Sequence, residues 1–180
     1  SLDAFLSRLP AGVQLFSLMQ ANPHLMDLLI DICGTAPELA HYLGDNAQVF
    51  DVVINPDFYR PLREESELTA DLANVLGQAD GYEAVLSAAR IWKNERHFRI
   101  GVHLLRGLAT PEEAAAAYSA VAGATLNALW PMVVAEFARR HGPPPGAGAA
   151  YLAMGKLGSR EMTVTSDLDL IVIYDADDPD

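Results

Sequence analysis

The sequence has a single cysteine, few aromatic residues and no apolar run that approaches transmembrane length. A lone cysteine, Cys33, excludes a disulfide within the chain, which is typical of a protein from a reducing compartment. Apolar neighbours surround Cys33, so we expect a small buried hydrophobe rather than a reactive thiol. The chain also lacks a basic segment followed by an apolar one of the kind that directs export, and a cytoplasmic location is therefore predicted.

Basic residues are scarce as well. The chain has 12 Lys and Arg residues against 24 Asp and Glu residues, which gives a formal net charge of −12 at pH 7. This balance argues against non-specific binding to nucleic acid or to a membrane surface. The acidic excess lies in residues 1–80 and 150–180, whereas residues 81–149 are slightly basic. We therefore expect any anionic ligand to meet the middle segment or a local basic group.

Residues 1–142 are predicted to be helical. Pro10, Pro23 and Pro37 each suit the first turn of a short helix. One long helix is expected over residues 81–108, because this stretch contains no proline and ends at a glycine. A second begins at Thr110-Pro111 and continues to the basic residues before Gly142.

The chain changes character after residue 142. A proline- and glycine-rich stretch predicts a linker over residues 143–149. Two short strands follow, over residues 149–154 and 168–174, and the second is rich in β-branched residues. Two strands cannot form a stable sheet alone, so either more chain follows or the strands rest on the helices. We predict a mainly α chain, with a helical domain (residues 1–142) followed by the first strands, a β-hairpin, of an incomplete α/β domain (residues 150–180). Ser1 is not a natural start, which suggests a piece of a longer protein.

Two carboxylates carry the clearest chemistry in the sequence. Asp167 and Asp169 stand two apart on the second predicted strand, so both should lie on one face while Leu168 and Leu170 face the core. Two such groups resist burial unless a cation lies between them. Mg²⁺ prefers hard oxygen ligands and bridges carboxylates to phosphate oxygens. We therefore predict Asp167 and Asp169 as catalytic metal ligands.

A glycine turn precedes these carboxylates. Gly155 and Gly158 allow the backbone to approach a phosphate, and Lys156 and Arg160 can neutralise phosphate charge. This is not a P-loop, because Gly-x-x-x-x-Gly-Lys-Ser/Thr is absent. Either half alone is a weak signal, because Asp-x-Asp can be a solvated strand face, a calcium site or a structural site, and the glycines can form a simple turn. The predicted nucleotide-binding residues are Gly155, Lys156, Gly158, Ser159, Arg160 and Ser166.

The two halves together resemble the signature of the DNA polymerase β-like nucleotidyltransferase superfamily, in which a small-residue turn precedes Asp-x-Asp or Asp-x-Glu. Gly155 fits the glycine, whereas Lys156 stands where a second small residue is usual. The segment is more similar to the glutamine synthetase adenylyltransferase (glutamate-ammonia-ligase adenylyltransferase) family. The motif of that family, Gly-Lys-Leu-Gly-x-x-Glu followed by Ser-Asp-(Leu/Ile)-Asp-Leu, is complete in residues 155–161 and 166–170. The similarity extends upstream to Pro37–Ala40 and Asp51, and to Arg90–Lys93 with Arg99-Ile100.

The resemblance implies a nucleotidyltransferase with ATP as substrate and Mg²⁺ as cofactor, which transfers AMP to a tyrosine hydroxyl of glutamine synthetase and so regulates nitrogen assimilation. A nitrogen-signalling regulatory protein is a further implied partner. The family is multifunctional: its N-terminal half removes AMP by phosphorolysis and its C-terminal half adds AMP. The preceding helices favour the C-terminal half, with the adenylyl-removing half as the alternative. The superfamily places a third carboxylate on a later strand, and none follows Tyr174, so we expect this piece to be inactive by itself.

A different class of function also stays open. The helices could form a docking or regulatory module without activity of its own. The helix over residues 81–108 would then present basic faces to an acidic partner or to phosphate, although paired surface charges account for them as well. The basic residues in question are Arg90, Lys93 and His97 on one face, and Arg96, Arg99, His103 and Arg106 on another.

Overall fold

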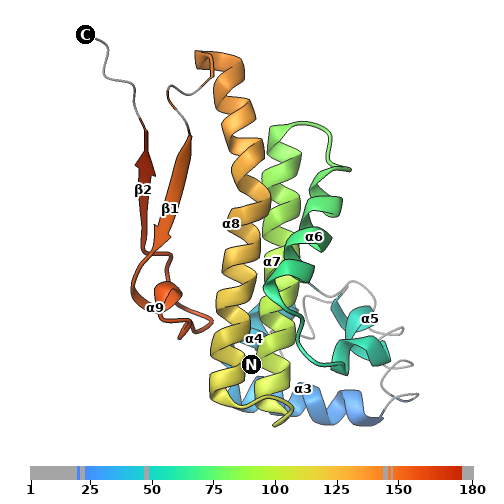
Figure 1. Ribbon diagram of the computed structural model, residues 1–180. Helices are drawn as coiled ribbons and strands as arrows, with labels where there is room; N and C mark the ends of the chain where they lie inside the picture. The colour runs from blue at the N-terminus through green and yellow to red at the C-terminus, as the bar shows by residue number, and fades with distance from the viewer. Residues whose placement is uncertain (1–19, 21–22, 47–48, 144–145, 147, 176–180) are drawn as a thin grey trace. The chain divides into compact units, whose positions relative to one another are not determined.

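The computed structural model describes residues 20, 23–46, 49–143, 146 and 148–175. They form helices and one two-stranded antiparallel sheet, which confirms the mainly α fold with a β-hairpin (Figure 1). The helix predicted at Pro10 lies outside the described residues. The chain divides into two compact units. The first unit comprises Ser1–Pro61 and Phe98–Thr110, and the second comprises Leu62–His97 and Pro111–Asp180. The long helix α7 (Tyr82–Leu105) contributes to both.

The first unit is built from short helices. Both α3 (Pro23–Thr35) and α4 (Pro37–Asp45) begin at a proline, as the sequence predicts. They are followed by α5 (Val49–Ile54) and the 3-10 helix η1 (Pro56–Tyr59). Cys33 in α3 is half-buried rather than buried. The core of this unit consists of apolar side chains, namely Leu25, Leu28, Leu29, Ile32, Leu39, Leu43, Val49, Val53, Phe58, Phe98 and Val102.

Arg99 of α7 organises the turn at η1. Its Nε donates to the carbonyl of Phe58 at 2.8 Å, and its Nη2 donates to the carbonyls of Asp57 at 3.1 Å and Arg60 at 2.7 Å. The buried His103 ring donates through Nε2 to the same Phe58 carbonyl at 2.7 Å. Carbonyl groups at the end of a short helix need donors, and these two α7 side chains supply them.

The second unit packs α6 (Glu65–Leu76), the N-terminal part of α7, and α8 (Pro111–His141) together. α6 buries Leu68, Leu72 and Leu76, which share one face because they are four residues apart. α8 buries mostly small residues, which let neighbouring helices approach closely. Its buried residues are Ala114, Ala117, Tyr118, Ser119, Ala120, Val121, Ala122, Ala124 and Ala128.

Asp71 of α6 joins α6 to α7. Its Oδ2 accepts a hydrogen bond from the indole Nε1 of Trp92 at 2.7 Å and from Nη2 of Arg96 at 2.7 Å. The Arg96 guanidinium lies over the Trp92 ring, 4.3 Å from its centroid. A charge that is both paired and hydrogen-bonded is stable in a half-buried position, so this contact fixes how the two helices pair.

α8 has the length and the composition of a helix that could cross a membrane. This corrects the expectation that no apolar stretch reaches such a length. The core helix of a soluble protein can have the same length and composition. Here the first half of α8 carries buried side chains of the second unit, and its last turn carries Arg139 and Arg140.

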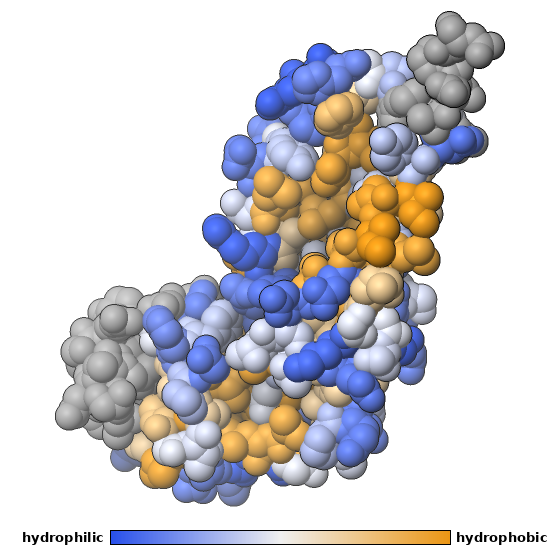
Figure 2. Space-filling view, turned by 90° about the vertical axis from the view of Figure 1, so that its left-hand side faces the viewer, coloured by the Kyte–Doolittle hydropathy of each residue, from blue (hydrophilic) through white to orange (hydrophobic). Residues whose placement is uncertain are grey.

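The hairpin consists of β1 (Ala149–Ala153) and β2 (Leu170–Tyr174), paired antiparallel with Ala149 opposite Tyr174 and Ala153 opposite Leu170. Apolar side chains gather on the molecular face in Figure 2. In the hairpin, the apolar residues Leu152, Ile171, Val172 and Ile173 are exposed. The hairpin belongs to the same compact unit as α6 and α8. The domain boundary that the sequence predicts at residues 143–149 stays a prediction.

The pH dependence of the stability of the second unit should come in part from His97. The His97 ring packs edge-on against Tyr118 with 5.0 Å between centroids, and burial, together with the nearby Lys93 charge, lowers the His97 pKa from 6.5 to about 4. The unfolded chain therefore binds the proton more readily, and stability falls as the pH drops from 6.5 towards 4. When the pH falls from 7 to 5, the free energy of unfolding of His97→Gln should decrease by roughly 1–2 kcal/mol less than that of the unsubstituted chain. Urea unfolding at the two pH values measures this difference.

His24→Gln is the matched control, because His24 is exposed. Its stability should follow the same pH dependence as the unsubstituted chain. Parallel curves for the chain and for His97→Gln would show that His97 is not buried in its neutral form.

Candidate active site

The predicted glycine turn follows directly from β1. Residues Gly155–Gly158 form one helical turn, α9, which ends the strand. The N–H groups of Gly158 and Ser159 donate to the carbonyls of Met154 at 2.9 Å and Gly155 at 3.0 Å. The first N–H groups of a helix have no acceptor within it, so those of Gly155, Lys156 and Leu157 are the ones available to a ligand.

The turn lies against the acidic motif. The N–H of Met154 donates to the carbonyl of Asp169 at 2.8 Å, one step beyond the last residue pair of the hairpin. Gly155 has a φ of +51°, and a Cβ at this position would collide with the Asp169 carboxylate. Only glycine combines this conformation with so close an approach. The hairpin therefore brings the two halves of the motif, Gly155 and Asp169, into contact.

Asp167 and Asp169 do not lie on the strand, which corrects the sequence prediction. β2 begins at Leu170, and both carboxylates precede it in a segment without regular structure. Both side chains are exposed, and Leu168 is exposed as well rather than facing the core. Within the described residues neither carboxylate forms an ion pair, so both are accessible to a cation from solution.

Other predicted nucleotide-binding residues cluster after the turn. Gly158 packs so closely that a Cβ there would lie 2.6 Å from the Ala153 carbonyl oxygen. Ser159 donates through Oγ to Glu161 at 3.0 Å. Arg160 has a φ of +60°, a left-handed conformation that costs energy for a side chain other than glycine. Its side chain and that of Lys156 are exposed, as phosphate-binding groups need to be.

Ser166 stabilises the loop before the acidic motif. Its Oγ accepts a hydrogen bond from the N–H of Thr163 at 2.9 Å and lies 3.0 Å from the Thr163 hydroxyl. The N–H of Ser166 in turn donates to the Thr163 carbonyl at 3.2 Å. Such local bonds replace those of regular structure in a loop. Ser166 thus has a clear role in shaping the backbone that leads into Asp167.

Two apolar residues anchor the loop to the helices. Leu157 and Met162 are buried, whereas most of their neighbours between residues 149 and 175 are exposed. The N–H of Met162 also lies 3.5 Å from the hydroxyl of Ser119, which is buried in α8. The helical part of the second unit thus supports the base of the glycine turn.

The donor set suits Mg²⁺. Asp167 and Asp169 offer hard carboxylate oxygens, and a Mg²⁺ site commonly combines one or two carboxylates with water and substrate phosphate. No cluster of three or more acidic, histidine or cysteine side chains able to hold a metal occurs among the residues that the structure describes.

The basic side chains of α7 mostly have partners within the chain. Arg96 pairs with Asp71, Arg106 pairs with Asp31 at 3.0 Å, and Arg99 binds the η1 carbonyls. Burial lowers the pKa of Lys93. Arg90 is exposed. Structural pairing therefore accounts for much of the basic pattern that the sequence left open.

A lysine-bearing glycine turn held against an acidic pair before a strand is typical of nucleotidyltransferases. The family model for glutamate-ammonia ligase adenylyltransferase matches residues 26–180. The chain therefore belongs to the glutamate-ammonia ligase adenylyltransferase family.

Relatives named bifunctional glutamine synthetase adenylyltransferase/adenylyl-removing enzyme are similar over nearly the whole chain. The protein of Mesorhizobium japonicum is 46% identical over 175 residues, which cover 97% of this chain and 18% of the relative. The Brucella suis protein is 45% identical over 175 residues with the same coverage. The Agrobacterium fabrum protein is 43% identical over 176 residues, which cover 98% of this chain and 18% of the relative. The chain thus spans about a fifth of the length of these relatives.

Some residues that shape the site were not found from the sequence. Tyr151, Asn127 and Ser119 connect the hairpin region to α8, yet they are ordinary polar residues in predicted regular structure. No local pattern marks them, because their partners lie far away in the sequence. Thr163 is different: a threonine three residues before Ser166 is a local signal for such side-chain to backbone bonds.

We expect Gly155→Ala to loosen the hairpin. The added methyl group meets the Asp169 carboxylate in a left-handed conformation, at a cost of about 1–3 kcal/mol. Hydrogen exchange at the N–H of Met154, which donates to Asp169, should then be at least about tenfold faster. Gly34→Ala is the control, because it lies in α3 with no atom within 4 Å of the added methyl group. Unchanged exchange in Gly155→Ala would contradict the close approach.

Proposed function

We propose that this chain is part of an enzyme that transfers AMP from ATP to a tyrosine hydroxyl of glutamine synthetase and thereby regulates nitrogen assimilation. The contact of Gly155 with Asp169 carries the proposal, because it joins the two halves of a complete family motif. Membership of the family supports the transferred group, and the names of the relatives support the protein substrate. A cytoplasmic location and a nitrogen-signalling regulatory partner are parts of the same proposal.

Each residue has a proposed role. Asp167 and Asp169 would hold Mg²⁺, and the cation would supply positive charge against the phosphates of the nucleotide. The N–H groups at the start of α9 and the ammonium group of Lys156 bind phosphate oxygens, and Arg160 adds charge nearby. Gly158, Ser159 and Ser166 shape the backbone around the nucleotide through the contacts described above. The attacking hydroxyl belongs to glutamine synthetase, so the chain itself needs no nucleophile.

The direction of the reaction is the finer part of the proposal. The helices that precede the motif resemble those before the C-terminal catalytic half, so we prefer transfer of AMP onto glutamine synthetase. The alternative is the adenylyl-removing half, in which phosphate attacks the phosphorus of tyrosine-bound AMP, so that ADP forms and the bond to the tyrosine oxygen breaks. Assays of the intact enzyme with ATP and unmodified glutamine synthetase, or with phosphate and the adenylylated protein, distinguish the two when Asp167 is substituted.

A second candidate is a docking or regulatory module. It is favoured by the amount of helix, since most of the described residues lie in helices rather than at the motif. Binding of Mg²⁺-ATP by this chain, and by a version that ends at Gly142, separates the candidates. If neither version binds nucleotide but either one binds glutamine synthetase, the module describes this part of the protein better.

Asp167→Asn and Asp169→Asn in the intact enzyme should each lower AMP transfer by at least about a hundredfold, because the cation loses a charged ligand. Transfer is measured with radiolabelled ATP and glutamine synthetase. Asp80→Asn is the matched control, since Asp80 is exposed between α6 and α7 and lies outside the motif. Full activity in both motif variants would sink the metal assignment.

A further inference from the structure

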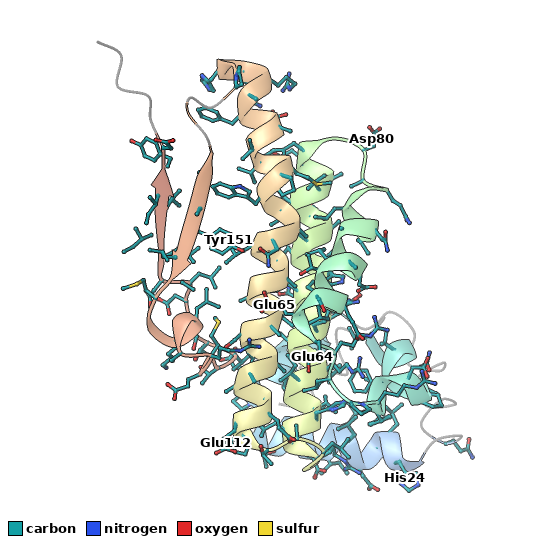
Figure 3. All side chains as sticks on the ribbon, in the orientation of Figure 1. His24, Glu64, Glu65, Asp80, Glu112 and Tyr151 are labelled. Atoms are coloured by element: carbon teal, nitrogen blue, oxygen red, sulfur yellow. The ribbon has the colours of Figure 1, made fainter. Side chains whose placement is uncertain are left out.

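A chain of three side chains joins the hairpin to two helices. The hydroxyl of Tyr151, at the centre of β1, donates to Oδ1 of Asn127 on α8. The Asn127 amide nitrogen then donates to Oε1 of Glu65, at the start of α6, at 3.3 Å. Figure 3 shows Tyr151 between β1 and α8, and Glu65 beside α8. Each group uses its donor or acceptor in one consistent direction, from tyrosine through amide to carboxylate.

Neighbouring residues of α8 pack closely against Glu65 and Tyr151. Glu65 lies so close to Gly123 of α8 that a Cβ there would be 2.6 Å from the carboxylate. Gly123 and Asn127 are one helical turn apart, so both face Glu65. The Trp130 ring packs against the Tyr151 ring with 6.1 Å between centroids. Burial and the Glu65 charge both raise the Tyr151 pKa, so the hydroxyl keeps its proton as a donor.

Glu65 has no cationic partner among the described residues. It is half-buried, and the hydrogen bond from Asn127 satisfies part of its carboxylate. A hydrogen bond from an amide to a carboxylate is stronger than one between two neutral groups, so the Glu65 carboxylate holds the Asn127 amide in place. This bond fixes the rotation of the amide, so that Oδ1 points to Tyr151. This arrangement favours a positioning role over a purely stabilising one.

Tyr151 attaches the hairpin to the helices at a point close to the glycine turn. The other attachments of the region, Leu157 and Met162, hold the loop and the base of the turn. Tyr151 instead holds the middle of β1, opposite Val172 of β2 and shortly before Gly155. A strand that is free to tilt would carry both Gly155 and, through the bond from Met154, Asp169 with it.

We propose that Tyr151, Asn127 and Glu65 are positioning residues that orient the hairpin on the helices and thereby align the glycine turn with the acidic motif. This inference rests on the proposed nucleotidyl transfer. Misalignment by a fraction of an ångström costs the transition state more than the bound nucleotide. The network therefore acts on the rate of transfer rather than on the affinity for ATP.

The test uses Tyr151→Phe in the intact enzyme, which removes the hydroxyl but keeps the ring against Trp130. We expect kcat per folded active site to fall about tenfold, with the Kd for Mg²⁺-ATP changed less than about threefold. Asn127→Ala should have the same effect, and the double variant should be no slower than either single one. Glu65→Ala removes the acceptor of the Asn127 amide and should lower kcat in the same way.

Tyr174→Phe is the matched control, because Tyr174 is an exposed tyrosine on β2 with a side chain 67% exposed. Normal kcat in Tyr151→Phe, or independent and additive losses in the double variant, would overturn the inference. A smaller folded fraction with unchanged kcat per site would show a structural role only and would overturn it as well.

Hydrogen exchange on the same variants separates this inference from the proposed function. Faster exchange at the N–H of Met154 in Tyr151→Phe but not in Tyr174→Phe supports the positioning network, even in an enzyme that transfers no AMP. Equal exchange in both variants counts against it. Absence of transfer in the unsubstituted enzyme sinks the proposed function alone.

Discussion

The bond from the N–H of Met154 to the carbonyl of Asp169 is the constraint on which the site depends. It extends the pairing of β1 with β2 by one step, to the place where β1 turns into α9. Because of this bond, the Asp169 carboxylate lies directly over Gly155, and the phosphate-binding turn and the metal-binding motif become one site. Without the hairpin register, the two motifs would be unrelated surface features.

The helices supply what a two-stranded hairpin lacks. A hairpin alone is marginally stable, and β2 exposes apolar side chains along most of its length, which is typical of a strand from a larger sheet. Here α8 contacts the hairpin region through Ser119, which lies beside the N–H of Met162, and through Asn127, which binds Tyr151. α8 is in turn held against α6 by its small buried residues, and Asp71 fixes α6 to α7. Only a few contacts therefore separate the helical core from the site.

The sequence predicted the elements well and one boundary badly. Prolines mark the starts of α3, α4 and α8, and Gly142 follows the end of α8, so local chemistry was sufficient there. The second strand was expected from residue 168, because the apolar pattern begins at that point. β1 ends at Ala153, since Gly155 turns away with a φ of +51°, and residues 167–169 have no partner strand beyond the Asp169 carbonyl. A strand extends only as far as the partner strand with which it pairs. The apolar pattern of β2 alone does not show where β1 ends.

By itself the sequence determined the motif residues, the mainly α architecture and the two strands, because each depends on neighbours a few positions away. The basic pattern of α7 shows the limit: only the structure decided that Arg96, Arg99 and Arg106 bind Asp71, the η1 carbonyls and Asp31. Tertiary structure alone likewise decided that Gly155 meets Asp169 and that Tyr151 reaches Glu65 through Asn127. The reason is the same in each case, since these partners are distant in sequence and no local propensity encodes which distant groups will meet.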